Sequence, residues 1–220
     1  MNARVTHFRQ DPLPDSVISE LVEYAHKTPT EYNLQPVHYF YVTSPEMRKS
    51  LWYACLKRHE LLEAPAFMVI SSEKESVKNY EARLENDLAA GALTEERFDL
   101  SCRFVELNFD VRPLGIGWLA KLLGVYFLRL FTPIPNFCRL FYREWLTKQA
   151  MLACSTLMHK AESLGLGTVV VHTFDEWRVK RYAKIPRNHA VVAVVAIGYV
   201  QHSVPHISTR EISEIFHRVK

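Results

Sequence analysis

The chain has 220 residues, of which 48% are hydrophobic and 23% charged, and its formal net charge is +3. These values are typical of a soluble globular protein with a sizeable core, and the charge is too small to indicate a nucleic-acid-binding protein. The four cysteines form no C-x-x-C motif, so the sequence predicts no metal site and favours reduced thiols in a cytoplasmic protein. They are Cys55, Cys102, Cys138 and Cys154.

In the first half of the chain, residues 17–26 carry apolar side chains at a helical period. Residues 37–43 are β-branched and aromatic, which predicts a strand. Ser44 followed by Pro45 is typical of a helix start, and we expect that helix to reach about residue 63. The uninterrupted apolar run 66–71 then predicts a strand buried on both faces.

Residues 73–110 are charged and helical in pattern, and an apolar segment follows at 113–135. Lys121 and Arg129 divide that segment, and glycine and proline interrupt it, so a membrane span is disfavoured. We expect a helix that covers a pocket as a lid or packs on a second subunit; the alternative is a membrane contact.

The second half begins with the clearest helix, predicted over 144–163 and capped by the glycines of residues 165–167. A strand at 168–171, a short helix at 175–184 and a strand at 190–200 follow, and the polar tail 201–220 has no core of its own. No strand is followed by a glycine-rich phosphate loop, and the strand spacing is uneven. The pattern therefore predicts one α+β domain over residues 1–220, with a sheet covered by helices.

The connector 28–36 joins the first predicted helix to the first predicted strand, and it contains two prolines, two threonines, one asparagine and one glutamine. Hydroxyls and amides in a rigid turn suit a planar polar ligand, although such residues are also common in ordinary turns.

Read in order, the motifs resemble those of the nitroreductase family of flavin enzymes. The family's A-P-S-x-x-N-x-Q-P-W segment is similar to Thr28-Pro-Thr30 with Asn33, Gln35 and Pro36, but Val37 replaces the tryptophan. Its G-L-G-T turn is similar to Gly165-Leu-Gly-Thr168, and its E-G-F-D turn to His172-Thr-Phe-Asp175. The resemblance implies FMN as cofactor and a three-layer sandwich with a mostly antiparallel central sheet. It also implies an intertwined homodimer with the flavin at the subunit interface and the tail 201–220 reaching onto the partner.

Carried over by position, the resemblance implies a set of cofactor-binding residues: Arg4, Thr6, Pro29, Thr30, Asn33, Gln35, Lys57, His172, Thr173 and Arg210. Arg4, Thr6 and Arg210 would hold the phosphate, and Lys57 would lie near the flavin pyrimidine. His172 and Thr173 would form the turn near N5, where His172 as a proton donor is one option, and no catalytic side chain is assigned beyond this turn.

Each assignment has a simpler alternative. The N-terminus could be a frayed terminus, and Asn33 a turn residue bonded to its own backbone. Lys57 could be an exposed helix lysine, and Arg210 a salt-bridged surface arginine. Thr173 and Glu176 also fit a helix capping box.

The activity implied is hydride transfer from NAD(P)H through flavin N5 to a nitroaromatic, quinone or similar acceptor, by a ping-pong mechanism. The alternative is a flavin-binding protein of the same fold with lost or specialised activity, either flavin sequestration or flavin fragmentation. The sequence predicts no nucleic-acid partner and no stable membrane insertion, and it does not decide between NADH and NADPH.

Overall fold

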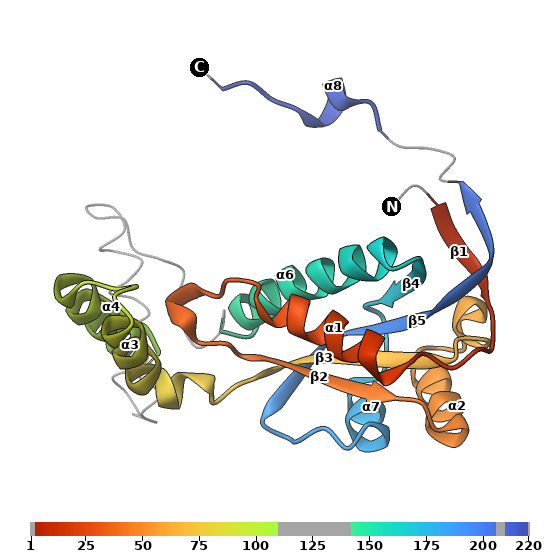
Figure 1. The fold of residues 1–220 in the computed structure, drawn as a ribbon, viewed down its shortest axis with the longest axis horizontal. Coiled ribbons are helices and arrows are strands. Elements are labelled where there is room, and N and C mark those ends of the chain that lie inside the picture. Colours follow the sequence, from red (N-terminus) through yellow and green to blue (C-terminus); the bar gives the residue numbers. More distant parts are fainter. Residues whose placement is uncertain (1–2, 110–141, 206–209, 220) are drawn as a thin grey trace, which may run out of the picture.

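The computed structural model describes residues 3–109, 142–205 and 210–219, with the backbone alone for residues 3 and 106–109. The strands are β1 (Ala3–Phe8), β2 (Val37–Val42), β3 (Ala66–Glu73), β4 (Leu166–Val171) and β5 (His189–Pro205). They form a sheet in the order β1-β5-β3-β2, with β4 also paired to β5, and every pairing is antiparallel (Figure 1). The α+β prediction is therefore confirmed.

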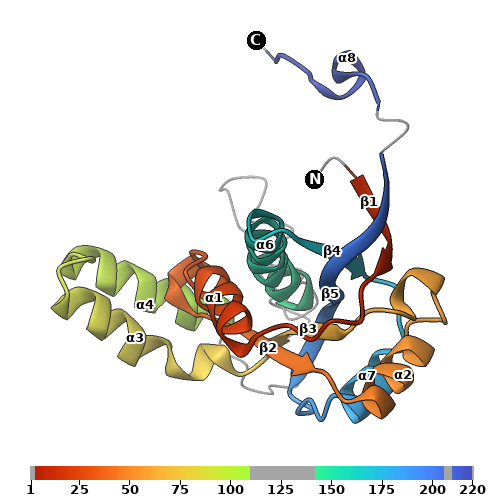
Figure 2. The same cartoon turned by 45° about the vertical axis from the view of Figure 1, so that its right-hand side comes forward.

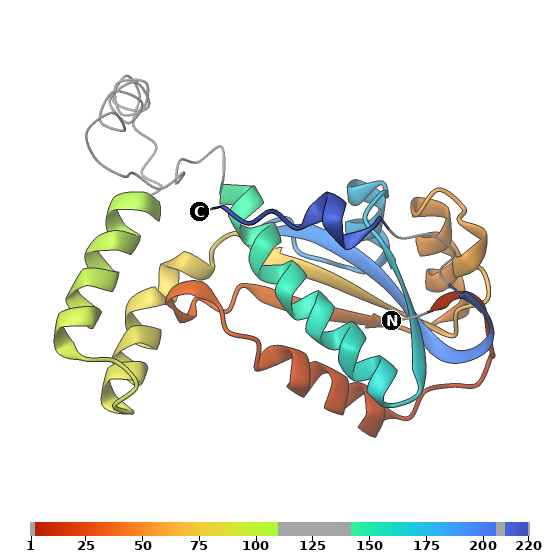
Figure 3. The same ribbon diagram turned by 90° about the horizontal axis from the view of Figure 1, so that it is seen from above.

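Helices cover both faces of this sheet (Figure 3). α1 (Asp15–His26) and α6 (Tyr142–Ser163) pack on one face, and α2 (Pro45–Ala54) and α7 (Glu176–Tyr182) pack on the other. Side chains alternate along a strand, so Met68 lies in the α1–α6 core while its neighbour Phe67 lies in the α2–α7 core. The double burial predicted for residues 66–71 and the three-layer sandwich are thus both confirmed.

A pair of helices, α3 (Tyr80–Ala89) and α4 (Glu95–Phe109), extends from one end of the sheet (Figure 2). A small core of Leu34, Val105, Trp145 and Leu146 joins this pair to the start of α6. The predicted helical stretch 73–110 is therefore divided. It begins as the end of β3, passes through the short helix η3 (Ser76–Asn79), and breaks between α3 and α4 around Gly91, whose φ is +70°.

The helix predicted to reach residue 63 ends at Ala54, so that boundary is wrong. Leu56 and Lys57 have φ values of 58° and 55°, a left-handed conformation that stops a helix, and the short helix η2 (His59–Leu61) follows. Beyond Ala54, the chain still places Cys55, Leu61 and Ala64 in the core between the sheet, α2 and α7, so apolar composition alone does not mark where α2 ends.

Both ends of the chain contain more strand than predicted. β1 was not expected at all, and β5 continues to Pro205 because it pairs with β1, from Phe8 opposite Val200 to Ala3 opposite Pro205. The tail thus begins five residues later than predicted. Gly165, with φ +74°, does end α6, whereas Gly167 lies in β4, where a Cβ atom would meet methyl groups at 2.5 Å and 2.8 Å.

Cys55 and Cys154 are buried free thiols, and burial raises the pKa of each to about 12. Cys102 is free and half-buried, while Cys138 lies outside the described residues. None of the helices in the described ranges is long and apolar enough to cross a membrane. The predicted lid at 113–135 also lies outside those ranges, so it stays a prediction.

Candidate functional site

The structure divides nine of the ten predicted cofactor residues into two groups, one around β1, the end of α2 and the turn after β4, and the other in the connector (Figures 1 and 3). The first, called here the β1 group, contains Arg4, Thr6, Lys57, His172 and Thr173. The second, the connector group, contains Pro29, Thr30, Asn33 and Gln35. Within the residues that the structure describes, no hydrogen bond or ion pair joins the two groups.

Two contacts assemble the β1 group. An ion pair between Arg4 and Glu60 fixes β1 against η2. The amide of Asp175 donates to the carbonyl oxygen of Ala54 over 2.9 Å, which holds the turn after β4 against the end of α2, three residues before Lys57. The segments around residues 4 and 57 therefore lie close together, and the turn at residues 172–173 lies against the end of α2, level with the middle of β3.

Arg4 and Thr6 belong to a strand paired with β5, although its register shifts on both sides of His7, so the alternative of a frayed N-terminus is wrong. The Thr6 hydroxyl donates to the carbonyl oxygen of His202 over 3.1 Å. Arg58 Nη2 lies 3.5 Å from Glu60 Oε1, so two guanidinium groups share one carboxylate, which leaves a net positive charge here. A backbone hydrogen bond, together with Arg4 and Arg58, holds the pKa of Glu60 below its usual value.

Lys57 is exposed and lies beyond the end of α2, so it is not a helix lysine. Its left-handed backbone is held by an amide that donates to the carbonyl oxygen of Trp52 over 3.1 Å. Its Nζ lies 5.4 Å from the centroid of the Tyr53 ring. A fixed backbone with an open ammonium group is suited to an anionic ligand.

His172 and Thr173 are exposed in the turn between β4 and α7. Asp175 caps α7, since its Oδ1 accepts from the amide of Arg178 over 3.1 Å. Glu176 instead accepts from the amide of Val191 over 3.1 Å. The capping box of Thr173 and Glu176 is therefore wrong, and within the described residues the Thr173 hydroxyl has no hydrogen-bond partner.

The connector group is held by bonds within its own chain. Tyr32 and Asn33, in the short helix η1 (Glu31–Asn33), and Gln35, which follows it, all have positive φ. Asn33 Nδ2 donates to both carboxylate oxygens of Asp87 on α3, over 3.0 Å and 2.9 Å, so its side chain does not bond to its own backbone. The side-chain Nε2 of Gln35 donates to Asn33 Oδ1 over 2.7 Å, and the backbone amide of Gln35 donates to Thr30 Oγ1 over 3.0 Å.

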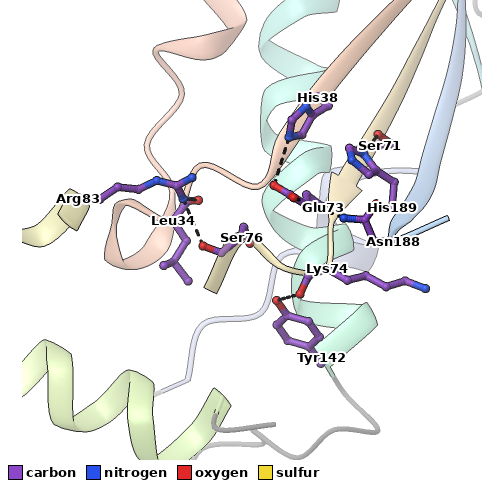
Figure 4. Close-up of polar contacts among 10 residues, drawn as sticks. All are labelled: Leu34, His38, Ser71, Glu73, Lys74, Ser76, Arg83, Tyr142, Asn188 and His189. Carbon is purple, nitrogen blue, oxygen red and sulfur yellow. Dashed lines mark hydrogen bonds and ion pairs between the residues drawn. The ribbon is translucent and has the colours of Figure 1, made fainter. Parts of the chain in front are cut away.

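Two sets of polar contacts that the sequence did not reveal lie near the connector, one on α3 and one in the neighbouring strands (Figure 4). Arg83 donates to the carbonyl oxygen of Leu34, which ties α3 to the connector. In the sheet, the Nδ1 atom of buried His189 forms a hydrogen bond with Ser71 Oγ over 2.9 Å. The ring centroids of His189 and His38 are 4.6 Å apart. His38 Nε2 in turn lies 3.5 Å from Glu73 Oε2. These residues were missed because nothing in sequence links position 38 to position 189.

Arg210 is exposed in a described segment, 210–219, whose residues are all exposed. Figures 1 and 2 show this segment, with α8 (Ile212–Ile215), standing away from the sheet. A single chain brings Arg210 to neither group, so its phosphate role stays a prediction.

Two surface hollows of about 250 Å³ and 480 Å³ lie beside Gln10 and Arg48. Neither is lined by a predicted cofactor residue.

The donors of the β1 group fit the chemistry of FMN. A flavin mononucleotide needs cations or N–H donors for its phosphate and positive charge near its pyrimidine end. Arg4 with Arg58 meets the first need, and Lys57 meets the second. The open hydroxyl of Thr173 adds a hydrogen-bonding group beside them.

Comparison with known proteins identifies the family. The sequence profile of the nitroreductase family matches residues 4–100 and 140–199. A Thermus thermophilus protein named NADH dehydrogenase is 25% identical over 195 residues, which cover 89% of this chain and 81% of that protein.

Solved structures share the fold. A Bacillus subtilis protein assigned as a nitroreductase superposes with a TM-score of 0.74 at 19% identity, covering 98% of this chain and 93% of that one. An Exiguobacterium sibiricum protein assigned as a nitroreductase, in complex with FMN, superposes with a TM-score of 0.72 at 14% identity, covering 98% and 92%. Because the profile spans most of the sequence and the fold agrees, the chain belongs to the nitroreductase family.

Proposed function

We propose that this protein is an FMN-dependent oxidoreductase that uses NADH or NADPH to reduce a small acceptor such as a nitroaromatic or a quinone. When bound, FMN supplies the redox chemistry, because its N5 accepts a hydride from nicotinamide and returns it to the acceptor. Donor and acceptor would occupy the same place in turn, which gives ping-pong kinetics. The observation that carries the proposal is the β1 group, which gathers cations and an open turn from three distant segments.

In this proposal Arg4 and Thr6 hold the phosphate. Both residues lie on β1, and Arg58 lies close enough to Arg4 for the two guanidinium groups to share the carboxylate of Glu60. A hydrogen bond to a charged group contributes about 1.5–3 kcal/mol, so loss of Arg4 should weaken FMN binding substantially.

Lys57 and the turn at residues 172–173 act on the ring. The ammonium group of Lys57 places positive charge where a reduced flavin gains negative charge. The backbone of the turn offers N–H groups, and the Thr173 side chain occupies space that is open where the family has glycine. We therefore expect Thr173 to restrict the size of the acceptor.

The connector group completes the site in a homodimer. It lies apart from Arg4 and Lys57 in one chain, so we expect it to meet the β1 group on a second chain. A two-fold dimer brings the same two surfaces together twice and builds two equal sites. Pro29, Thr30, Asn33 and Gln35 would then cover the face of the flavin that the β1 group leaves open.

The test is the visible spectrum of the purified protein during an anaerobic titration. We expect a flavin spectrum with one FMN per chain, bleaching by NADH or NADPH, and recovery on addition of a quinone or a nitroaromatic. A flavin that neither nicotinamide bleaches would exclude the reductase.

That same outcome would support the second candidate, a flavin-binding protein without turnover. The observation that favours it is the exposed Thr173 side chain in the turn that, by the family resemblance, lies near N5. In that case Thr173→Gly tests the cause, because the variant should be bleached only if the Thr173 side chain is what keeps the nicotinamide from the flavin.

A further inference from the structure

A patch of aromatic and basic side chains lies beside the β1 group, where α2 ends and α7 begins. We call it the α2–α7 patch, and it contains Tyr53, Lys57, Trp177, Arg178 and Arg181. Its two aromatic rings, those of Tyr53 and Trp177, are exposed, and cationic side chains lie over both. Tyr53 is 46% exposed and Trp177 is 65% exposed.

Each ring of the patch has a guanidinium or ammonium group over it. Lys57 Nζ and Arg178 Cζ lie 5.4 Å and 5.1 Å from the centroid of Tyr53. Arg181 Cζ lies 5.5 Å from the centroid of Trp177. Trp177 and Arg181 are four residues apart on one helix, so they share a face of α7.

The positive charge of the patch is only partly neutralised. Arg178 pairs with Asp175 over 3.3 Å, and Glu176 is engaged by Arg143 at 2.6 Å and Lys180 at 3.0 Å. Within the described ranges, no carboxylate lies in ion-pair reach of Lys57 or Arg181. Cations without a carboxylate partner, beside exposed aromatic rings, favour a ligand that is both anionic and aromatic.

The position of the patch indicates how such a ligand would lie. α7 starts directly after the turn at residues 172–175, and Lys57 belongs to both the patch and the β1 group. At 1.5 Å per helical residue, Arg181 lies about 9 Å along the axis from Asp175. A long ligand with one end at the turn would therefore run along α7 toward Trp177 and Arg181.

We propose that the α2–α7 patch binds the adenosine end of NADPH and makes the protein selective for NADPH over NADH. The adenine stacks on Trp177, and Arg181 holds the 2′-phosphate, which a guanidinium group can bind with two parallel hydrogen bonds. Arg178 adds positive charge from its place over Tyr53. This inference rests on the proposed function, in that the nicotinamide end is taken to lie at the turn.

The direct test is calorimetric titration of the purified protein with adenosine 2′,5′-bisphosphate and with 5′-AMP. We expect the bisphosphate to bind at least ten-fold tighter, because only it carries the 2′-phosphate. Arg181→Glu should abolish that difference. Arg97→Glu, the same charge change at an exposed site on α4, is the matched control and should leave both affinities unchanged.

The kinetic test is stopped-flow reduction of the holoprotein by each nicotinamide. Arg181→Glu should raise the KM for NADPH about 10- to 100-fold and change that for NADH by less than about three-fold. Trp177→Ala should raise both, because stacking does not depend on the 2′-phosphate, and Trp177→Phe should retain most of the affinity.

The outcomes separate the two proposals. Equal binding of bisphosphate and 5′-AMP, or an Arg181→Glu protein that still prefers NADPH, would overturn the patch even in an active reductase. A protein that binds the bisphosphate through Arg181 but is bleached by neither nicotinamide would retain the patch and lose the proposed function.

Discussion

The β1 group and the connector group carry similar polar residues but use them differently. At the β1 group, Lys57 and Thr173 are open, and Arg4 and Arg58 share a single carboxylate. In the connector group, the amide of Asn33 is already bonded to Asp87 and Gln35. The difference indicates that the β1 group supplies charge to a ligand, whereas the connector group supplies a rigid surface. Four predictions test this contrast, in descending order of expected effect.

The strongest test combines one variant from each group. Arg4→Gln and Asn33→Ala should each weaken FMN binding, Arg4→Gln by about 10- to 100-fold, since a charged hydrogen bond is lost. If each site is built from both chains, a mixed dimer of the two variants contains one site with both substitutions and one with neither. Refolding the two variants together should therefore restore tight FMN binding, measured by fluorescence titration.

Refolding each variant alone is the control and should restore nothing. Tight binding that fails to return in a mixture shown to contain heterodimers would mean that both groups act within one chain, or that one of them does not contact FMN.

The connector should depend on its own chain for rigidity. Asp87→Ala removes the acceptor of both Asn33 bonds and leaves a half-buried amide without its partner, so we expect a loss of about 1–2 kcal/mol in the free energy of unfolding. Urea denaturation measures it. Glu85→Ala, an exposed position on the same helix, should change the stability by less than about 0.5 kcal/mol; an equal loss in the two variants would contradict the role of Asp87.

The strands next to the connector should also be sensitive to acid. Burial, followed by the charge of His38, lowers the pKa of His189 below its ordinary value of 6.5; Glu73 opposes this shift and Lys180 adds to it. The unfolded chain therefore takes up a proton as the pH falls below 6.5 while the folded chain does not. The free energy of unfolding should fall there by up to about 1.4 kcal/mol per pH unit, and this contribution is fully present above pH 6.5.

Urea unfolding between pH 7.5 and 5.5 measures this slope. His189→Gln retains a hydrogen-bonding group beside Ser71 and should flatten it, whereas the same change at exposed His26 should not. A slope unchanged by His189→Gln would assign the acid sensitivity to other groups.

The smallest effect should come from the carboxylate beside the β1 group. Glu60→Gln frees Arg4 and Arg58 from their shared partner and removes a negative charge near the proposed phosphate site. Charge pairs at a protein surface contribute about 0.2–1 kcal/mol, so FMN should bind up to about five-fold tighter. Weaker binding in this variant would indicate that Glu60 positions Arg4 instead of competing with the ligand for it.

The predicted site could be recognised only in part from the sequence. The resemblance located the cofactor residues, but it could not show that they lie in two separated groups. Nor could it show that Glu60 pairs with Arg4, because 56 positions separate them and no periodic pattern connects them. Trp177 and Arg181 are a local pattern in the sequence, yet their neighbourhood to Lys57 depends on the packing of α7 against α2.

The sequence by itself determined the elements whose signal is local. Apolar periodicity predicted α1 and α6, the double-sided burial of β3 was readable from its uninterrupted apolar run, and Gly165 marked the end of α6. The tertiary structure alone decided where the chain leaves its local preference: the end of α2 at Ala54, the strand β1, and the extension of β5. The physical reason is that β1 and the end of β5 are stabilised by pairing with each other across almost the full length of the chain. A strand formed by such distant partners leaves little trace in the neighbouring residues.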